Sequence, residues 1–151
     1  GHDISEEDTP VEAGLSFAVD MSKPAFIGRD AIAQQKAQQK AQGLKQRLVQ
    51  FLLTDPDAML HHNEPIYRDN EIVGYIASGM YGHTLGAAVG LGYVRRPGQN
   101  AISGKDGGEP NGADAEFIRS GHYEIEVAGK RIEAKASLRP LYDPTSKRVR
   151  G

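Results

Sequence analysis

The chain has 151 residues, of which 38% are hydrophobic, and its 18 basic and 20 acidic side chains give a formal net charge of −2. This length supports one substantial core or a main core with a small satellite. The near-neutral charge gives no overall attraction to nucleic acid or to an anionic membrane. The absence of cysteine excludes disulfides, thiolate chemistry and cysteine-ligated metals. No apolar stretch approaches the roughly 20 residues that a membrane-spanning helix needs.

The first zone, residues 1–43, opens with acidic sequence and then a helix-start signal. Thr9 can cap a helix, Pro10 suits its first position and Glu12 can reach back to the cap amide. Apolar and small or polar residues alternate over 16–21 and predict a short extended segment.

A helix is predicted from Gly28-Arg29-Asp30 to Gly43. Its residues are strong helix formers, and Gly43 supplies a C-cap. Ile32 is its only large apolar side chain, so we expect the helix to dock by its first turn and to expose the rest. The repetitive QQKAQQKAQ run is therefore an exposed helix face.

The second zone, residues 45–94, indicates strands. They are predicted at 47–53, 66–68, 71–76 and 87–94, with a tight hairpin at Asp69-Asn70 and a glycine-rich linker at 78–86.

The third zone begins with a long, flexible loop at 97–121, in which Phe117 and Ile118 are the only anchors. A hairpin follows, with strands at 122–127 and 130–136. Hairpin-connected antiparallel strands with one exposed face predict an α+β, mainly β fold, with a small barrel or sandwich.

The motifs reveal no catalytic chemistry on their own. The G-x-x-x-G-x-G run ending at Gly92 lies within a strand, whereas a phosphate loop joins a strand to a helix. Gly90 and Gly92 instead indicate close approach of a neighbouring element. The five histidines lack metal-ligand spacing, although His83 lies in a turn of a kind that often contacts ligands. These residues alone identify a globular module of undetermined function.

Three segments together carry a resemblance to a known family: residues 1–32, which include T-P-x-E-A-G-L and F-I-G-R, residues 73–94 and residues 139–151. They resemble the aminomethyltransferase (glycine-cleavage T-protein) family. YGHTLG and LYDPTSKRVRG are closest to the version fused behind the flavin domain of sarcosine and dimethylglycine dehydrogenases. The resemblance implies a C-terminal barrel of the aminomethyltransferase type.

The family binds tetrahydrofolate in the central cavity of three domains. The resemblance implies that the catalytic Asp, the pterin-binding Glu and the flavin-binding residues lie in upstream domains. We therefore expect a C-terminal piece of a one-carbon-transfer enzyme, with FAD in the parent chain only and the upstream domains and folate as partners. Residues 1–43 would be the remnant of the folate-binding domain, and 44–151 the barrel domain with 97–121 as an insertion. The resemblance implies that residues 1 to about 23 belong to a sheet whose other strands are absent, so we expect them to be partly disordered. A cytoplasmic location is expected, or the mitochondrial matrix in a eukaryote.

The resemblance also implies five folate-contacting candidates. Lys23 stands at the family's basic position, where a cation can pair with the glutamyl tail of folate, although an exposed loop lysine is an equal reading. Tyr142 is the best match for an aromatic near the C-terminus, or it packs under the barrel. Arg29 belongs to F-I-G-R and either contacts the site or stabilises the helix start. Tyr81 and His83 could face the cavity.

Two alternatives remain open. One is a fragment of the glycine cleavage aminomethyltransferase itself, which would lack a flavin domain. The other is a non-catalytic barrel that serves only for docking.

Overall fold

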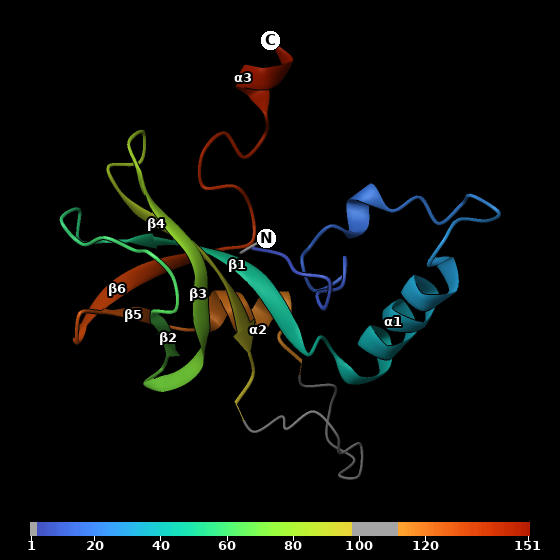
Figure 1. The fold of residues 1–151 in the computed structure, drawn as a ribbon, viewed down its shortest axis with the longest axis horizontal. Coiled ribbons are helices and arrows are strands. Elements are labelled where there is room, and N and C mark those ends of the chain that lie inside the picture. The colour runs from blue at the N-terminus through green and yellow to red at the C-terminus, as the bar shows by residue number, and fades with distance from the viewer. Residues whose placement is uncertain (1–2, 98–111) are drawn as a thin grey trace.

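The computed structural model describes residues 3–97 and 112–151 (Figure 1). A short 3-10 helix, η1, spans Ser16–Ala18. The α-helices are α1 (Arg29–Gln42), α2 (Ala115–Ser120) and α3 (Lys147–Arg150), and the strands are β1 (Gln46–Leu53), β2 (Pro65–Arg68), β3 (Glu71–Gly82), β4 (Ala87–Arg95), β5 (Tyr123–Val127) and β6 (Lys130–Ser137).

The six strands form a closed barrel in the order β1-β4-β3-β2-β5-β6, and every neighbouring pair is antiparallel. Closure leaves no continuous free sheet edge. The mainly β fold predicted from the sequence is confirmed, and the barrel, rather than the sandwich, is the form observed.

Two tight turns set the register of the hairpins. Asp69 and Asn70 both have positive φ, 50° and 71°, and join β2 to β3. Ala128 and Gly129, with φ of 50° and 77°, join β5 to β6 in the same way. Positive φ at both central residues matches the right-handed twist of the flanking strands. Both predicted hairpins are therefore confirmed.

The core fills the barrel, and α2 lies against one end of it. Phe51 of β1 and Tyr123 of β5 pack edge to face, with ring centroids 5.5 Å apart. The α2 side chains Phe117 and Ile118 are buried in the same cluster. Asp114 caps this helix by accepting a 2.7 Å hydrogen bond from the Phe117 amide. This helix corrects the prediction of a loop over 97–121, because residues 115–120 are helical. Residues 98–111 of that predicted insertion lie outside the described residues.

Two further predictions are wrong. The predicted linker at 78–86 begins within β3, which continues to Gly82 and pairs with β4 from Gly74 to Gly82. Glycine is required there, because a Cβ on Gly79 would lie 2.4 Å from the Leu60 Cβ. The predicted extended segment at 16–21 begins as η1, and Phe17 is 86% exposed. Alternation specifies a strand only when one face is buried, and η1 buries no residue.

The helix predicted before Gly43 is confirmed as α1. Gly28 precedes it in the left-handed region, and the Gly43 amide donates to the Gln39 carbonyl. None of its residues is buried. Figure 1 shows α1 to one side of the barrel.

Gly92 provides a test of the close strand packing. A Cβ at this position would lie 2.6 Å from the Tyr75 carbonyl oxygen and 2.7 Å from the Ile66 Cδ1. We expect Gly92→Ala to lower the free energy of unfolding by about 1–3 kcal/mol in urea denaturation, because the backbone cannot yield. Gly90→Ala is the matched control, since its Cβ would meet only the ends of two side chains at 3.0 Å. Equal losses in both variants would contradict this interpretation.

Candidate functional site

The segment before η1 packs on the outside of the barrel along β1. Strand β6 pairs only with Gln50–Leu53 of β1, and the Leu48 amide donates to the Glu12 carbonyl at 3.0 Å. The predicted capping box is confirmed, because the Glu12 amide donates to Thr9 Oγ1 and Glu12 Oε2 accepts from the Thr9 amide. Val11, only 2% exposed, is buried behind this turn. The segment expected to be partly disordered is thus in contact with the barrel.

A polar chain joins this segment to two strands. Arg95 Nε donates to Gln46 Oε1 at 2.9 Å, and Gln46 Nε2 donates to Asp8 Oδ1 at 3.1 Å. Gln46 is only 8% exposed, so both ends of its amide are satisfied in a buried position. A second contact joins the Ser78 hydroxyl to the Asp3 carboxylate.

Tyr93 of β4 lies beside this chain. Burial, together with the negative charges of Asp8, Glu12 and Asp3, raises the pKa of Tyr93 to about 12. Its hydroxyl lies near Asp8 without a hydrogen bond of standard geometry. The neutral phenol is the stable form in this acidic setting.

Lys23 lies on the loop between η1 and α1, and Arg29, the first residue of α1, bonds to the backbone of that loop. Arg29 Nε donates to the Lys23 carbonyl at 3.1 Å, and its Nη2 donates to the Met21 carbonyl at 3.4 Å. Asp20 tightens the same loop by accepting from the Ser22 amide and hydroxyl, which lowers the pKa of Asp20. Arg29 therefore fixes the loop backbone, while the Lys23 side chain is exposed.

Tyr81 and His83 lie together where β3 turns toward β4. Their rings meet edge to face, with centroids 5.2 Å apart. Tyr81 is half-buried and His83 is exposed.

Tyr142 lies on the segment after β6. Its side chain is 44% exposed, and its hydroxyl accepts from Arg148 Nη1 at 2.5 Å. The preceding residue is fixed to β1, because the Leu141 amide donates to Gln50 Oε1 at 3.2 Å. Tyr142 therefore does not pack under the barrel, and its ring remains accessible.

The five predicted residues form three separate groups. Lys23 and Arg29 lie at the start of α1 and on the loop before it, Tyr81 and His83 lie where β3 ends, and Tyr142 lies between β6 and α3. The described residues show no side-chain contact between these groups. They provide charge and aromatic surface, but no enclosed pocket of their own.

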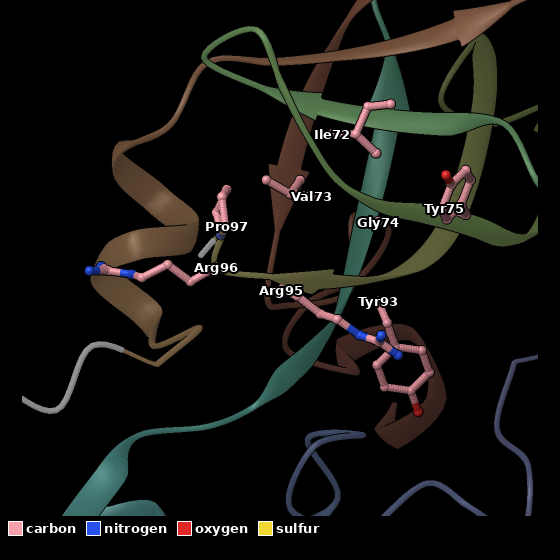
Figure 2. A pocket seen from close by; sticks show the side chains of 8 residues that line it. All are labelled: Ile72, Val73, Gly74, Tyr75, Tyr93, Arg95, Arg96 and Pro97. Atoms are coloured by element: carbon pink, nitrogen blue, oxygen red, sulfur yellow. The ribbon is translucent and has the colours of Figure 1, made fainter. Parts of the chain in front are cut away.

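A groove with a volume of about 350 Å³ lies elsewhere, between the start of β3 and the end of β4. Figure 2 shows that the start of β3 and the end of β4 line it. The Arg95 side chain points toward Tyr93, and the Arg96 side chain points the opposite way, toward α2. Arg96 stacks over Phe117, with its guanidinium carbon 4.5 Å from the ring centroid. The two cations do not converge on a common point, so this groove has no defined anion site.

Within residues 3–97 and 112–151, no group of three or more His, Asp or Glu side chains has a metal-binding arrangement. No helix in the same residues is long and apolar enough to span a membrane.

Residues 46–143 match the family model described as the glycine cleavage T-protein C-terminal barrel domain. The chain belongs to this family. The match starts at the first residue of β1 and ends one residue beyond Tyr142, so it contains the whole barrel. The predicted family resemblance is thereby confirmed.

Three relatives extend over nearly the whole chain. It is 40% identical over 152 residues to the 4-methylaminobutanoate oxidase (formaldehyde-forming) of Paenarthrobacter nicotinovorans, covering 100% of this chain and 16% of that protein. It is 33% identical over 150 residues to human mitochondrial sarcosine dehydrogenase, covering 99% of this chain and 15% of the relative. It is 39% identical over 146 residues to the mouse mitochondrial pyruvate dehydrogenase phosphatase regulatory subunit, covering 93% and 16%. The chain thus spans about a sixth of the length of these relatives.

A solved structure supports the fold. The glycine cleavage system aminomethyltransferase T from Bartonella henselae matches with a TM-score of 0.65 and 20% identity, covering 91% of this chain and 33% of that one. The barrel therefore has the architecture of the aminomethyltransferase C-terminal domain.

Sequence reasoning missed the polar contacts on the outside of β1. The signal was present as two glutamines in QRLVQFLL, at Gln46 and Gln50, in a strand whose other residues are apolar except Arg47. Their partners, Asp8, Arg95 and Leu141, are too distant in sequence to be assigned without the fold.

The buried tyrosines predict a loss of stability at high pH. In the unfolded chain a tyrosine ionises near pH 10, whereas burial raises the pKa of Tyr123 to about 12 in the folded barrel. The stability that the buried, neutral Tyr123 contributes is therefore fully present below pH 10 and is lost as the pH rises from 10 to 12. For Tyr123, which is 2% exposed, the slope reaches about 1.4 kcal/mol per pH unit. Urea denaturation at stepped pH measures it.

Tyr123→Phe should flatten this pH dependence, and Tyr93→Phe should do so to a smaller extent because Tyr93 is less buried. If the double variant loses stability between pH 10 and 12 as steeply as the wild-type chain, the assignment to these two phenols is wrong.

Proposed function

We propose that this chain is the C-terminal part of a tetrahydrofolate-dependent one-carbon-transfer enzyme and contributes part of its folate site. The observation that carries the proposal is the loop that presents Lys23. Arg29 holds the backbone of this loop by two hydrogen bonds and leaves the lysine ammonium exposed. A cation on a fixed loop suits a ligand with a carboxylate tail.

Tyr142 would provide the second contact. Its hydroxyl is already paired with Arg148, and 44% of the residue is exposed. An accessible aromatic ring suits a flat heteroaromatic ligand such as a pterin. Tetrahydrofolate, when bound, supplies the nitrogen atoms that take up a one-carbon unit. This chain's residues would bind and orient the cofactor, and no residue here is assigned to the flavin.

The parent enzyme would be an FAD-dependent demethylating dehydrogenase. Two relatives that align with nearly the entire chain are named as a 4-methylaminobutanoate oxidase (formaldehyde-forming) and a sarcosine dehydrogenase. The proposed division places residues 1–43 in the folate-binding domain and residues 44–151 in the barrel domain. The catalytic acid and the flavin would lie upstream, so the isolated chain would not turn over. The same proposal places the parent in the cytoplasm, or in the mitochondrial matrix of a eukaryote, as the names of two relatives suggest.

Two other functions have support. The aminomethyltransferase T structure shares the fold, which fits a parent without a flavin domain. A docking role fits the third relative, which is named as a regulatory subunit. Flavin absorbance in the purified parent separates the first alternative from the dehydrogenase, and folate binding by the chain separates both enzymes from the docking module.

The folate proposal predicts a weaker complex when the candidate cation is removed. We expect Lys23→Ala to raise the Kd for tetrahydrofolate about two- to fivefold, the range of an exposed charge pair. Isothermal titration of the 151-residue chain measures this constant. Lys40→Ala, at an exposed lysine on α1, is the matched control and should leave the Kd unchanged. Equal effects of the two variants, or no binding by the wild-type chain, would refute the proposal.

A further inference from the structure

We propose that Gln46 and Gln50 of β1 are positioning residues that anchor the two halves of the folate site to a single strand. The inference rests on the proposed function, because it assigns Lys23 to one half and Tyr142 to the other.

The two glutamines lie on the same outward face of β1. Residues 46, 48 and 50 alternate with the core residues Val49 and Phe51, which are at most 1% exposed. The glutamines are four positions apart, which corresponds to about 13 Å along a strand. The outer surface of β1 therefore offers two polar anchor points at a fixed spacing.

Gln46 anchors the N-terminal segment. It accepts from Arg95 Nε and donates to Asp8, and thus uses both ends of its side-chain amide. The adjacent bond from the Leu48 amide to the Glu12 carbonyl holds the same segment two residues further along β1. This segment leads directly into η1 and the loop that carries Lys23.

Gln50 anchors the C-terminal segment. Strand β6 ends at Ser137, and the Ser137 hydroxyl closes a tight turn by bonding to both the amide and the carbonyl of Arg139. The chain then returns to β1, where the Leu141 amide donates to Gln50 Oε1. This bond lies one residue before Tyr142. It fixes the backbone from which the aromatic ring projects.

Neither glutamine is needed for the core. Both lie on the outer face of β1, and their partners Asp8, Arg95 and Leu141 are not themselves residues of the main hydrophobic cluster. A glutamine at these two positions is therefore explained by its partners rather than by the packing of the barrel.

Isosteric variants of the full 151-residue chain test the anchors separately. Gln46→Met should speed hydrogen exchange of the Leu48 amide about fivefold and leave the Leu141 amide unchanged, and Gln50→Met should do the reverse. Each should raise the Kd for tetrahydrofolate by a similar factor, while the exchange of core amides such as Phe51 stays constant. Gln38→Met, at an exposed glutamine of α1, is the matched control and should change neither.

Two further variants restore the bonds. Gln46→Glu places a carboxylate against Asp8 and should weaken binding, whereas Asp8→Asn combined with Gln46→Glu lets the new amide donate to the new carboxylate and should restore it. Gln50→Glu keeps an acceptor for the Leu141 amide and should behave as the wild-type chain. A purely structural defect would not be reversed by exchanging donor and acceptor.

Three results would overturn the inference, each in a different way. Exchange rates equal to those of Gln38→Met would show that the glutamines anchor nothing. Faster exchange with unchanged folate affinity would remove their positioning role and leave the folate site intact. If the wild-type chain and Gln38→Met both bind no tetrahydrofolate, the proposed function itself fails, and the exchange rates then report only on the anchors.

Discussion

Incomplete pairing along β1 is the constraint on which the rest of the structure depends. The strand pairs with β4 over almost its whole length, but with β6 only from Gln50 onward. Backbone groups at the unpaired half need other partners. The Leu48 amide finds one in the Glu12 carbonyl. The N-terminal segment thus pairs with the part of β1 that β6 does not reach, and this pairing joins the segment to the barrel.

The sequence predicts the features that depend on neighbouring residues, and it does not predict those that depend on contacts between distant segments. The Asp69-Asn70 turn, α1 and the capping box at Thr9 depend on neighbours within a few residues, and all were predictable. The continuation of β3 through its glycines was not, because those glycines are tolerated only where Leu60 and β4 approach closely. Helix α2 was also missed, since six residues beside a glycine-rich stretch give too weak a periodic signal. Only contact with the barrel end makes Phe117 and Ile118 a buried pair.

The candidate site shows the same limit. Family resemblance indicated which residue types to consider, and the structure shows how each is held. Arg29 bonds to loop carbonyls, Tyr142 bonds to Arg148, and Lys23 remains exposed. Their separation on the barrel surface agrees with a chain that spans about a sixth of its long relatives. A cavity shared between domains would be lined only in part by one of them.

The solvent-exposed helix α1 has a consequence for how the chain tolerates changes in length. One backbone hydrogen bond, from the Leu48 amide to the Glu12 carbonyl, joins the two ends of the segment between these residues. Helix α1 lies within this segment and buries no residue. The entropy of closing so long an excursion changes by only about 0.1 kcal/mol when one helical turn is added. The same insertion would displace the end of the helix by about 5.4 Å. The number of residues in α1 is therefore nearly neutral for folding, yet it sets the reach of the loop that carries Lys23.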